Sequence, residues 1–250
     1  MNSTLSPPRT DLELFQANRL FYDALWSDVR LVQPERFNTW PLVSSLVAQS
    51  VRRLEVAPGL RPRLPLNGTH FVDISVPALA QLRECGANGI LGRISSLPFP
   101  DGAFDLVCAL DIIEHVDDDE RALSELSRVA EPGGALLIST PLHPTHWTAF
   151  DEFVGHRRRY EPDQLAAMLE RHGLTVERSA AHGMQPRSSW LVDFGMWAMI
   201  HRRKQAMFVY NHVMMPLAVR FEKELTFAPG MLETEGVEEV LLLCRKHGEA

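Results

Sequence analysis

The stretch LPFPDGAFDLVCAL at residues 97–110 decides the fold of this 250-residue chain more directly than any other part of the sequence. Its second half, Phe104–Ala109, is an apolar run interrupted by a single acid, Asp105. Runs of this kind are buried on both faces, which is typical of strands in parallel sheets. The stretch therefore predicts a buried strand of a parallel sheet.

Outward from this strand, short apolar runs alternate with helical stretches. We expect further strands at 53–56, 71–74, from 90 onward, and at 135–139, 174–178 and 240–244, with helices that begin near Ser75, Asp117 and Pro162. This alternation predicts an α/β fold of the Rossmann-like, doubly wound type, with a mostly parallel seven-stranded sheet and helices on both faces. Ligands bind such sheets at the carboxyl ends of the strands.

Other segments surround this core. Residues 1–50 show helical spacing of apolar side chains and predict an N-terminal helical cap on a core at 51–183. Residues 184–232 predict a helical insertion, and 233–250 the final strand of the core. The insertion is rich in methionine and aromatic residues, and such surfaces adapt to apolar partners. Three roles stay open for it: a lid over a lipophilic substrate, packing against the N-terminal helices, or a homodimer contact.

Composition and charge exclude several classes of function. The chain is 45% hydrophobic and carries a net charge of −7, so no overall basic field would hold nucleic acid. Its three cysteines lie far apart without metal-ligand spacing, and no signal-peptide pattern follows Met1. We therefore expect a cytoplasmic protein without a metal site. The basic run at 201–204 splits the apolar residues 190–219 into pieces too short for a transmembrane segment, although a peripheral membrane contact stays open.

Two acids follow the first two expected strands. Glu55 begins the sequence Glu-Val-Ala-Pro-Gly, and Asp73 lies 18 positions later, at the end of the second strand. An acid at that place can accept hydrogen bonds from both ribose hydroxyls of a nucleoside. The pair alone is a weak signal, because an acid ends many strands.

Three further motifs follow in a fixed order. They are LPFPDGAFDLV at 97–107, EHV at 114–116 and RVAEPGGAL at 128–136. In order and spacing they resemble the small-molecule class I S-adenosylmethionine-dependent methyltransferases, specifically the methyltransferase type 11-like group. The resemblance covers about residues 53–177 and implies the cofactor S-adenosyl-L-methionine.

The resemblance also implies roles for individual residues. The side chains expected to line the cofactor site are Glu55, Ala57, Gly59, Arg61, Asp73, Ile74, Ile94, Leu110, Asp111 and His115. Among them, Glu55, Ala57 and Gly59 would line the methionine side, and Asp73 would hold the ribose. Adenine would lie beside Ile74 and the amide of Ile94, and His115 would line the cleft or buttress its loop.

The sequence departs from the family pattern in the loop after the first strand. The family reads acid-x-G-x-G-x-G, whereas only Gly59 remains here, with Ala57 and Arg61 in place of the other glycines. Pro62 and Pro65 make a regular helix between the first two strands improbable. The positive helix end that would favour the methionine carboxylate is then missing, and Arg61 or Arg63 could supply that charge instead.

The loop after the fifth strand would border the acceptor. It carries His143, His146 and His156, and a histidine is the usual base for removing an acceptor proton near neutral pH. All three are candidate catalytic residues, with His143 and His146 favoured, although each also suits a structural role. The pattern Gly-His-x-Arg-Arg-Tyr at 155–160 recurs in relatives of this group, where it is expected to stabilise the loop.

Two functions are therefore weighed. The first is S-adenosylmethionine-dependent methyl transfer to a small, apolar acceptor, with O-methylation favoured. The alternative is a methyltransferase-fold protein that binds the cofactor only structurally, or has lost it, and acts as a non-methylating enzyme or binding protein. A nicotinamide dehydrogenase is excluded because residues 57–62 cannot serve as GxGxxG. The apolar segment 190–219 also leaves open a membrane-associated enzyme that modifies glycans or lipids.

Overall fold

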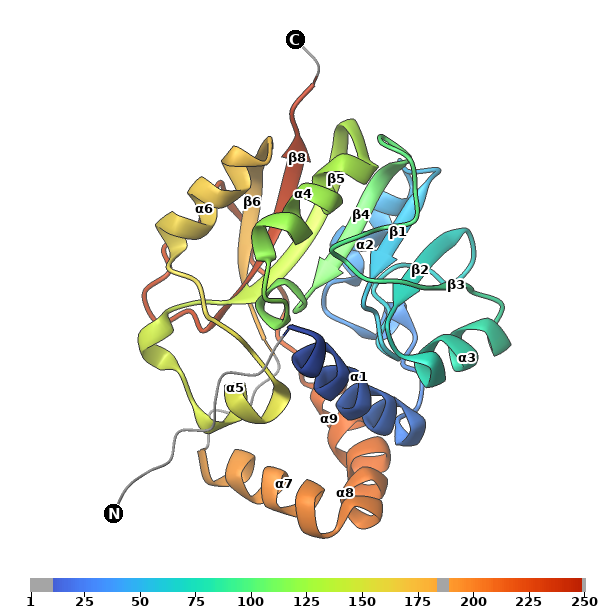
Figure 1. Ribbon diagram of the computed structural model, residues 1–250. Coiled ribbons are helices and arrows are strands. Elements are labelled where there is room, and N and C mark those ends of the chain that lie inside the picture. The colour runs from blue at the N-terminus through green and yellow to red at the C-terminus, as the bar shows by residue number, and fades with distance from the viewer. Residues whose placement is uncertain (1–10, 184–188, 249–250) are drawn as a thin grey trace.

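The computed structural model describes residues 11–183 and 189–248, and it is built around one mixed sheet (Figure 1). Its eight strands lie in the order β3-β2-β1-β4-β5-β8-β6-β7. Their bounds are β1 Arg53–Val56, β2 Thr69–Asp73, β3 Asn88–Leu91, β4 Phe104–Leu110, β5 Ala130–Pro141, β6 Leu174–His182, β7 Ala228–Pro229 and β8 Glu239–Lys246. Part of the expected N-terminal cap (residues 1–10), part of the insertion (residues 184–188) and residues 249–250 lie outside the described residues.

Five strands, β3 to β5 in sheet order, are parallel, which confirms the expected doubly wound α/β core. The last strand, β8, runs antiparallel to both β5 and β6, so it begins where β5 ends, with Glu239 opposite Pro141. The strand order reverses between β1 and β4, next to each other at the centre of the sheet. The carboxyl ends of β1, β2, β4 and β5 and the start of β8 therefore share one edge.

Three details differ from the sequence expectations. The sheet has eight strands because the two-residue strand β7 adds to the edge at β6. The third strand spans Asn88–Leu91, so it begins two residues before the expected start at Ile90. Helix α4 ends at Val129 and β5 begins at once, so the Pro-Gly-Gly turn at 132–134 lies inside a strand. The pairing with β4 shifts register there, and Gly133 takes a positive φ of 78°, as a bulge requires.

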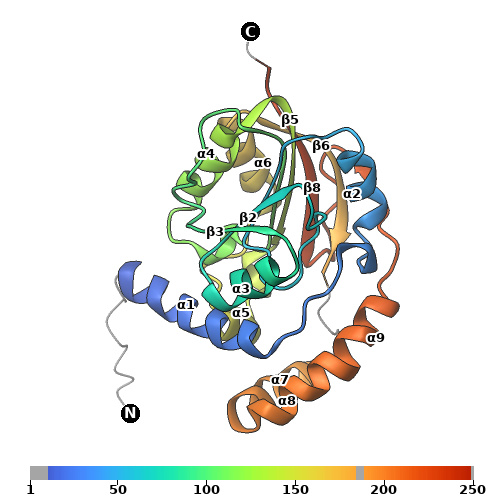
Figure 2. The same ribbon diagram turned by 90° about the vertical axis from the view of Figure 1, so that its right-hand side faces the viewer.

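Helices cover both faces of the sheet (Figures 1 and 2). The α-helices are α1 Asp11–Asp28, α2 Trp40–Val47, α3 Val76–Glu84, α4 Asp119–Val129, α5 Ala149–Val154, α6 Pro162–Arg171, α7 Ser189–His201, α8 Arg203–Val209 and α9 Met215–Arg220. Short helical turns are η1 Pro34–Arg36, η2 Ile113–His115, η3 Pro144–His146 and the π-turn η4 Tyr210–Met214.

The core follows from alternation along the strands, since successive side chains point to opposite faces. On β4, Val107 and Ala109 face α4 and α6, which bring buried side chains such as Leu126 and Leu169. Leu106 and Cys108 face the other way, against Leu42 and Val43 of α2. Each fully buried leucine contributes roughly 1.5–3 kcal/mol, so both helical layers are firmly held to the sheet. The sheet edge that carries the strand ends is thereby fixed in place.

The crossover from β1 to β2 forms no helix, as its prolines predict: residues 57–68 are turns and extended chain. Instead, the buried carboxylate of Glu55 accepts hydrogen bonds from the backbone N–H of Arg63, at 2.9 Å, and of Leu64, at 2.8 Å. Leu60 and Leu64 are fully buried beneath the crossover. One acid and two apolar anchors thus position a segment that a helix would otherwise hold.

The helices of the insertion lie beyond the sheet edge that carries the strand ends, next to α1 (Figures 1 and 2). Met199, Met207 and Tyr210 pack with Leu25 and Trp26 of α1. The guanidinium of Arg203 pairs with Asp28 at the end of α1, and the amide of Asn211 donates to the Asp28 carbonyl. In the described ranges, no helix has both the length and the apolar character needed to cross a membrane.

The Glu55 anchor makes the stability of the protein depend on pH. Burial raises the pKa of Glu55 from 4.5 to about 7, although the backbone N–H groups of Leu64 and Arg63 act in the opposite direction. Between these values the folded chain keeps a proton that the unfolded chain loses, so stability falls as pH rises from about 4.5 to about 7. We expect Glu55→Gln to remove up to about 3 kcal/mol of this fall, measured by urea unfolding at several pH values. An unfolding free energy whose pH slope is the same in both proteins would contradict the role of Glu55.

Candidate active site

The first polar cluster lies at the carboxyl ends of β1 and β2. Asp73 ends β2 and is only 5% exposed. Its carboxylate accepts hydrogen bonds from the backbone N–H of Gly59, at 2.9 Å, and of Ser75, at 2.8 Å. Burial raises the pKa of Asp73 to about 6, while these backbone donors lower it. The acid is therefore held in place by the turn that precedes it and the helix that follows it.

The turn after β1 adopts the backbone geometry for which glycine is usually selected. Ala57 has φ of 57° and Gly59 has φ of 52°, both in the left-handed region. The left-handed conformation costs an alanine such as Ala57 roughly 1 kcal/mol more than it costs a glycine. The loop thus keeps the left-handed form that the family's glycines allow, although two of the three glycines are replaced.

Aromatic side chains of α1 cover this turn. The indole of Trp26 lies so close to Gly59 that a β-carbon on the glycine would be 2.2 Å from Trp26 Cζ2. The hydroxyl of Tyr22 lies 3.3 Å from Nε2 of His115, and the two rings meet edge to face. Burial, with the carboxylates of Glu114, Asp111 and Asp73 around it, raises the pKa of Tyr22 far above its usual range. Tyr22 therefore lies among the acids at the strand ends. We call the region between α1 and these strand ends the crevice.

The guanidinium of Arg61 lies near the Trp26 ring. The guanidinium carbon is 5.8 Å from the Trp26 ring centroid and 5.2 Å from that of Tyr210 in the insertion. Burial and the neighbouring Arg63 lower the pKa of Arg61 to about 10. In the described part of the chain, Nε of Arg61 is buried without a hydrogen-bond partner. Arg63 instead lies over the Phe37 ring at 3.6 Å.

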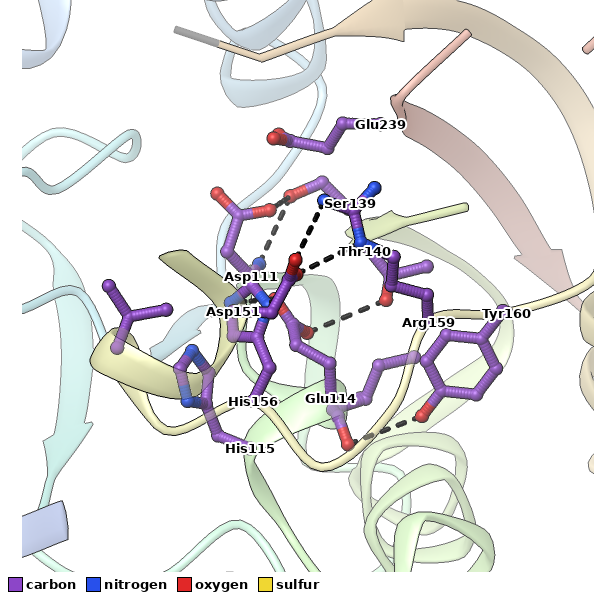
Figure 3. Close-up of polar contacts among 12 residues, drawn as sticks. Asp111, Glu114, His115, Ser139, Thr140, Asp151, His156, Arg159, Tyr160 and Glu239 are labelled. Atoms are coloured by element: carbon purple, nitrogen blue, oxygen red, sulfur yellow. Dashed lines mark hydrogen bonds and ion pairs between the residues drawn. The ribbon is translucent and has the colours of Figure 1, made fainter. Parts of the chain in front are cut away.

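A second polar cluster forms where β4, β5, β6 and β8 meet (Figure 3). The Ser139 hydroxyl donates to Asp111 at 2.5 Å, and the Asp111 N–H donates to the Ser139 carbonyl at 3.1 Å. A carboxylate oxygen of Asp111, a ring nitrogen of His182 and a carboxylate oxygen of Glu239 all lie within 4.8 Å of one another. Nε2 of His182 is 3.7 Å from the Glu239 carboxylate. Asp111 is exposed, so this cluster opens to solvent.

Burial sets the protonation of this second cluster. It raises the pKa of Glu239 well above its usual range, and the carboxylates of Asp111 and Glu114 act in the same direction. Burial also lowers the pKa of His182 to about 4, against the attraction of Asp111, so this histidine is neutral near pH 7. Glu239 is therefore harder to ionise than an exposed glutamate. Two neighbouring carboxyl groups are suited to binding a hydroxyl.

The third cluster closes the bottom of the crevice and holds the loop after β5 (Figure 3). Asp151 is fully buried and accepts hydrogen bonds from His156, at 2.8 Å, and from Arg159, at 2.9 and 3.0 Å. The Tyr160 hydroxyl donates to Asp119 at 2.9 Å. Burial acts to raise the pKa of Asp151, but hydrogen bonds from His156, Arg159 and Thr148 hold it below its usual range. The Gly-His-x-Arg-Arg-Tyr pattern thus holds the loop together.

The three candidate catalytic histidines are not brought to one place. Nε2 of His143 lies 2.8 Å from the carbonyl of Thr234, and Nδ1 of His146 lies 3.0 Å from Glu238, with the two rings 5.0 Å apart. His156 packs against His115, at 4.6 Å between ring centroids, and is bound by Asp151. Burial and the nearby His156 lower the pKa of His115 well below its usual value, to about 3.

The apolar candidates are distributed over the core. Ile94 is 5% exposed and belongs to the cluster between the sheet and α4, whereas Leu110 packs on the α2 face. Ile74 follows Asp73 and is half-buried. The carboxylate of Glu55 is already taken up by the crossover N–H groups. Glu55 thus acts on the crevice through the loop that it holds.

The sequence interpretation missed four residues of the crevice: Tyr22, Trp26, His182 and Glu239. Helical spacing placed α1 in the chain but could not tell that it lies over Gly59. Glu239 is the first residue of the last strand, β8, directly before the apolar run expected at 240–244, and only the antiparallel direction of β8 brings it to the edge with Asp111. A sequence signal for it exists in retrospect, namely an acid before the final apolar strand.

Comparison with known proteins agrees with this geometry. The family model described as a methyltransferase domain matches residues 60–138. A probable S-adenosylmethionine-dependent methyltransferase of Mycolicibacterium smegmatis is 37% identical over 90 residues, which are 34% of this chain and 34% of that protein. Over part of its core the chain is thus similar to S-adenosylmethionine-dependent methyltransferases. The chain spans about a third of the length of that relative.

Solved structures support the methyltransferase fold over most of the chain. A possible histamine N-methyltransferase from Thermotoga maritima has a TM-score of 0.57 at 17% identity, and covers 95% of this chain and 100% of its own. The [4+2]-cyclase SpnF has a TM-score of 0.53 at 16% identity, and covers 84% of this chain and 81% of its own. At these identities the likeness concerns the fold alone.

The residues of this methyltransferase core fit S-adenosylmethionine. Each carboxyl oxygen of Asp73 accepts one backbone N–H and keeps a lone pair for a ribose hydroxyl. Gly59 has no β-carbon, but the Trp26 indole occupies that face of the glycine, so this contact does not itself support cofactor binding. The buried Nε of Arg61, without a partner in the described residues, is a donor suited to a carboxylate.

The loop after β5 depends on its buried acid. We expect Asp151→Asn to lower the free energy of unfolding by about 3 kcal/mol, because it leaves the buried guanidinium of Arg159 without its main counter-charge. The control is Glu152→Gln, the exposed neighbour on the same helix, which should change stability by less than about 0.5 kcal/mol. Denaturant unfolding of both variants measures this. Equal, small losses in the two variants would show that the ion pair does not hold the loop.

Proposed function

We propose that this protein transfers a methyl group from S-adenosylmethionine to an oxygen atom of a small, largely apolar acceptor. The observation that carries the proposal is the juxtaposition of two acidic clusters at one sheet edge. Asp73 and Gly59 lie at the ends of β1 and β2, and Asp111 with Glu239 lies across the neighbouring strand ends. The first suits a nucleoside, and the second suits a hydroxyl group.

The proposed binding of the cofactor uses groups that the fold already positions. Asp73 would accept hydrogen bonds from the ribose hydroxyls, and Arg61 would donate to the methionine carboxylate. Ile74 would pack beside the adenine, and the backbone amide of Ile94 would hold it. When bound, S-adenosylmethionine supplies an electrophilic methyl group on a sulfonium centre. Glu55 would act only by holding the turn.

The proposed chemistry of the chain is removal of one proton from the acceptor. Asp111 would accept the proton of the acceptor hydroxyl while the acceptor oxygen forms the new bond to the methyl carbon. The Ser139 hydroxyl orients this carboxylate, and protonated Glu239 beside it donates to the acceptor oxygen before the reaction. S-adenosylmethionine would supply the methyl group and keep the electron pair of its sulfur–carbon bond, so charge and atoms would balance. Much of the rate would come from positioning.

The apolar character of the acceptor is inferred from the walls of the crevice. Tyr22 and Trp26 of α1 stack with ring centroids 6.2 Å apart, and Met199 and Met207 of the insertion belong to the same apolar cluster as Trp26. Aromatic rings and methionines favour an apolar, polarizable body over a strongly charged one. An acceptor with one hydroxyl on an apolar ring would satisfy both the walls and the Asp111 cluster.

The cofactor part of the proposal can be tested without an acceptor. We expect Asp73→Asn to weaken S-adenosylhomocysteine binding by about tenfold to a hundredfold in isothermal titration calorimetry, since a carboxylate that accepts hydroxyl donors is lost. Asp101→Asn, an exposed acid at the opposite end of β4, serves as control and should bind as the unchanged protein does. If millimolar S-adenosylhomocysteine fails to bind the unchanged protein, the proposed function is wrong.

The acceptor part needs a separate measurement. With tritiated S-adenosylmethionine and a panel of phenols, Asp111→Asn should lower the transfer rate at least about a hundredfold. Its affinity for S-adenosylhomocysteine should stay within about threefold, because Asp111 acts on the acceptor. Glu239→Gln should lower the rate less than Asp111→Asn, since the amide keeps a donor. Full activity of Asp111→Asn would return the role of base to His143 or His146.

A second candidate function rests on the position of α1. Trp26 lies directly on Gly59, and Tyr22 lies among the acids of the crevice. A protein that binds the cofactor only structurally, or that uses the crevice for another reaction, would tolerate such side chains there. The structural likeness to a cyclase is compatible with this candidate but shows the fold alone. Binding of S-adenosylhomocysteine without any methyl transfer to the phenol panel would favour it.

A further inference from the structure

Exposed apolar side chains are concentrated on the helical insertion. Of the sixteen large apolar side chains exposed in the described part of the chain, eleven belong to residues 190–221. They are Trp190, Leu191, Phe194, Trp197, Ile200, Phe208, Val209, Val213, Met214, Leu217 and Phe221. We call these eleven side chains the insertion surface. Single exposed apolar residues are ordinary, but this concentration in one segment of the chain points to an interaction site.

The insertion surface exists because helix α7 is apolar on two sides. Its inner side places Met199 in the cluster formed with α1, as α8 does with Met207. Its outer side carries Trp190, Phe194 and Trp197, at helical spacing. An amphipathic helix of a globular protein would carry charged residues on that outer side. The inner contacts therefore hold the helix, and the outer side chains are left for a partner.

Exposed apolar side chains continue along the chain through α8, η4 and α9. The π-turn η4 ends at Met214, and Pro216, the second residue of α9, has no N–H for a regular helical ladder. On these helices Phe208, Val213 and Leu217 are exposed, by 46% or more. The consecutive helices of the insertion thus all expose apolar side chains.

The charge of the insertion is opposite to that of the rest of the chain. Residues 189–223 contain five basic and two acidic side chains, a net charge of +3, whereas the whole chain carries −7. The basic residues are Arg202, Arg203, Lys204, Arg220 and Lys223. Arg203 forms an ion pair with Asp28. Arg202 and Lys204, at the junction of α7 and α8, are exposed. The two exposed cations therefore lie at the junction of the two parts of the surface.

We propose that the insertion surface docks on an anionic lipid bilayer. Tryptophan and phenylalanine on one side of a helix, with lysine and arginine beside them, are the composition of helices that lie in the membrane interface. Exposed cations at the junction of α7 and α8 would meet acidic headgroups, while the aromatic side chains enter the acyl boundary. The docking needs no spanning helix.

A second copy of the chain fits this surface less well. A two-fold contact would place each basic cluster near the same cluster of its partner, and like charges at close range oppose association. The centres of protein interfaces are also depleted of lysine. An anionic bilayer meets the apolar side chains and the cations together, so the charge favours it over a dimer.

The surface lies on the functional side of the molecule. Figures 1 and 2 place α7, α8 and α9 beyond the sheet edge where the strands end, on the same side of the sheet as α1. Helix α7 also contacts α5, which follows the loop of the crevice. A bilayer-dissolved acceptor would thus reach the molecule from the side that carries the site. This consequence rests on the proposed function, whereas the docking itself does not.

Flotation with lipid vesicles tests the docking in the absence of cofactor and acceptor. The full chain should float with vesicles of equal parts phosphatidylglycerol and phosphatidylcholine, and more weakly with phosphatidylcholine alone. Trp190→Ser with Phe194→Ser should weaken binding at least about tenfold, since two aromatic side chains no longer leave water. Arg202→Gln with Lys204→Gln should lower binding about 25-fold on the anionic vesicles only.

The matched control is Val51→Ser, which removes an apolar side chain that is 83% exposed and lies before β1, away from the insertion. It should bind vesicles as the unchanged protein does. Failure of the unchanged protein to float with anionic vesicles overturns the proposal. So does a dimer by light scattering that Trp190→Ser with Phe194→Ser converts to monomer, because the surface would then be a subunit contact. Either result leaves S-adenosylhomocysteine binding, and hence the proposed function, untouched.

Discussion

The hydrogen bonds from Arg63 and Leu64 to the buried carboxylate of Glu55 are the interaction on which the rest of the crevice depends. Prolines prevent a helix in the β1–β2 crossover, so the backbone N–H groups there need another acceptor. Glu55 supplies it from the strand itself. The turn before the crossover is thereby fixed, and the Gly59 N–H reaches Asp73. A polar anchor of this kind replaces secondary structure at the price of a buried acid.

The crevice concentrates acids that burial makes reluctant to ionise. Burial raises the pKa values of Glu55, Asp73, Glu114 and Glu239. Such a group of acids is costly in an empty crevice and becomes favourable beside a cation. A sulfonium is a cation that methyl transfer converts into a neutral thioether. Under the proposed function, the same acids would favour the bound cofactor over the spent one.

Helix α1 connects the crevice to the insertion. Its aromatic residues Tyr22 and Trp26 lie over the crevice, while Leu25 and Trp26 also pack with Met207 of α8. The insertion therefore touches the cofactor turn through one helix. Arg61 joins the same contact, since its guanidinium lies between Trp26 and Tyr210. Movement of the insertion would be transmitted to Gly59 by packing alone.

The α/β core, the approximate positions of its strands along the chain and the place of Asp73 at the end of the second strand could be predicted from the sequence, because apolar periodicity and family motifs are local properties of the chain. The sequence by itself also determined that the β1–β2 crossover has no helix, since proline acts on its own turn. The tertiary structure alone decided which residues share the crevice. Glu239 reaches Asp111 because β8 runs antiparallel, and Trp26 reaches Gly59 because α1 folds back over the sheet edge. Contacts between residues so far apart in the chain depend on packing that no local pattern encodes.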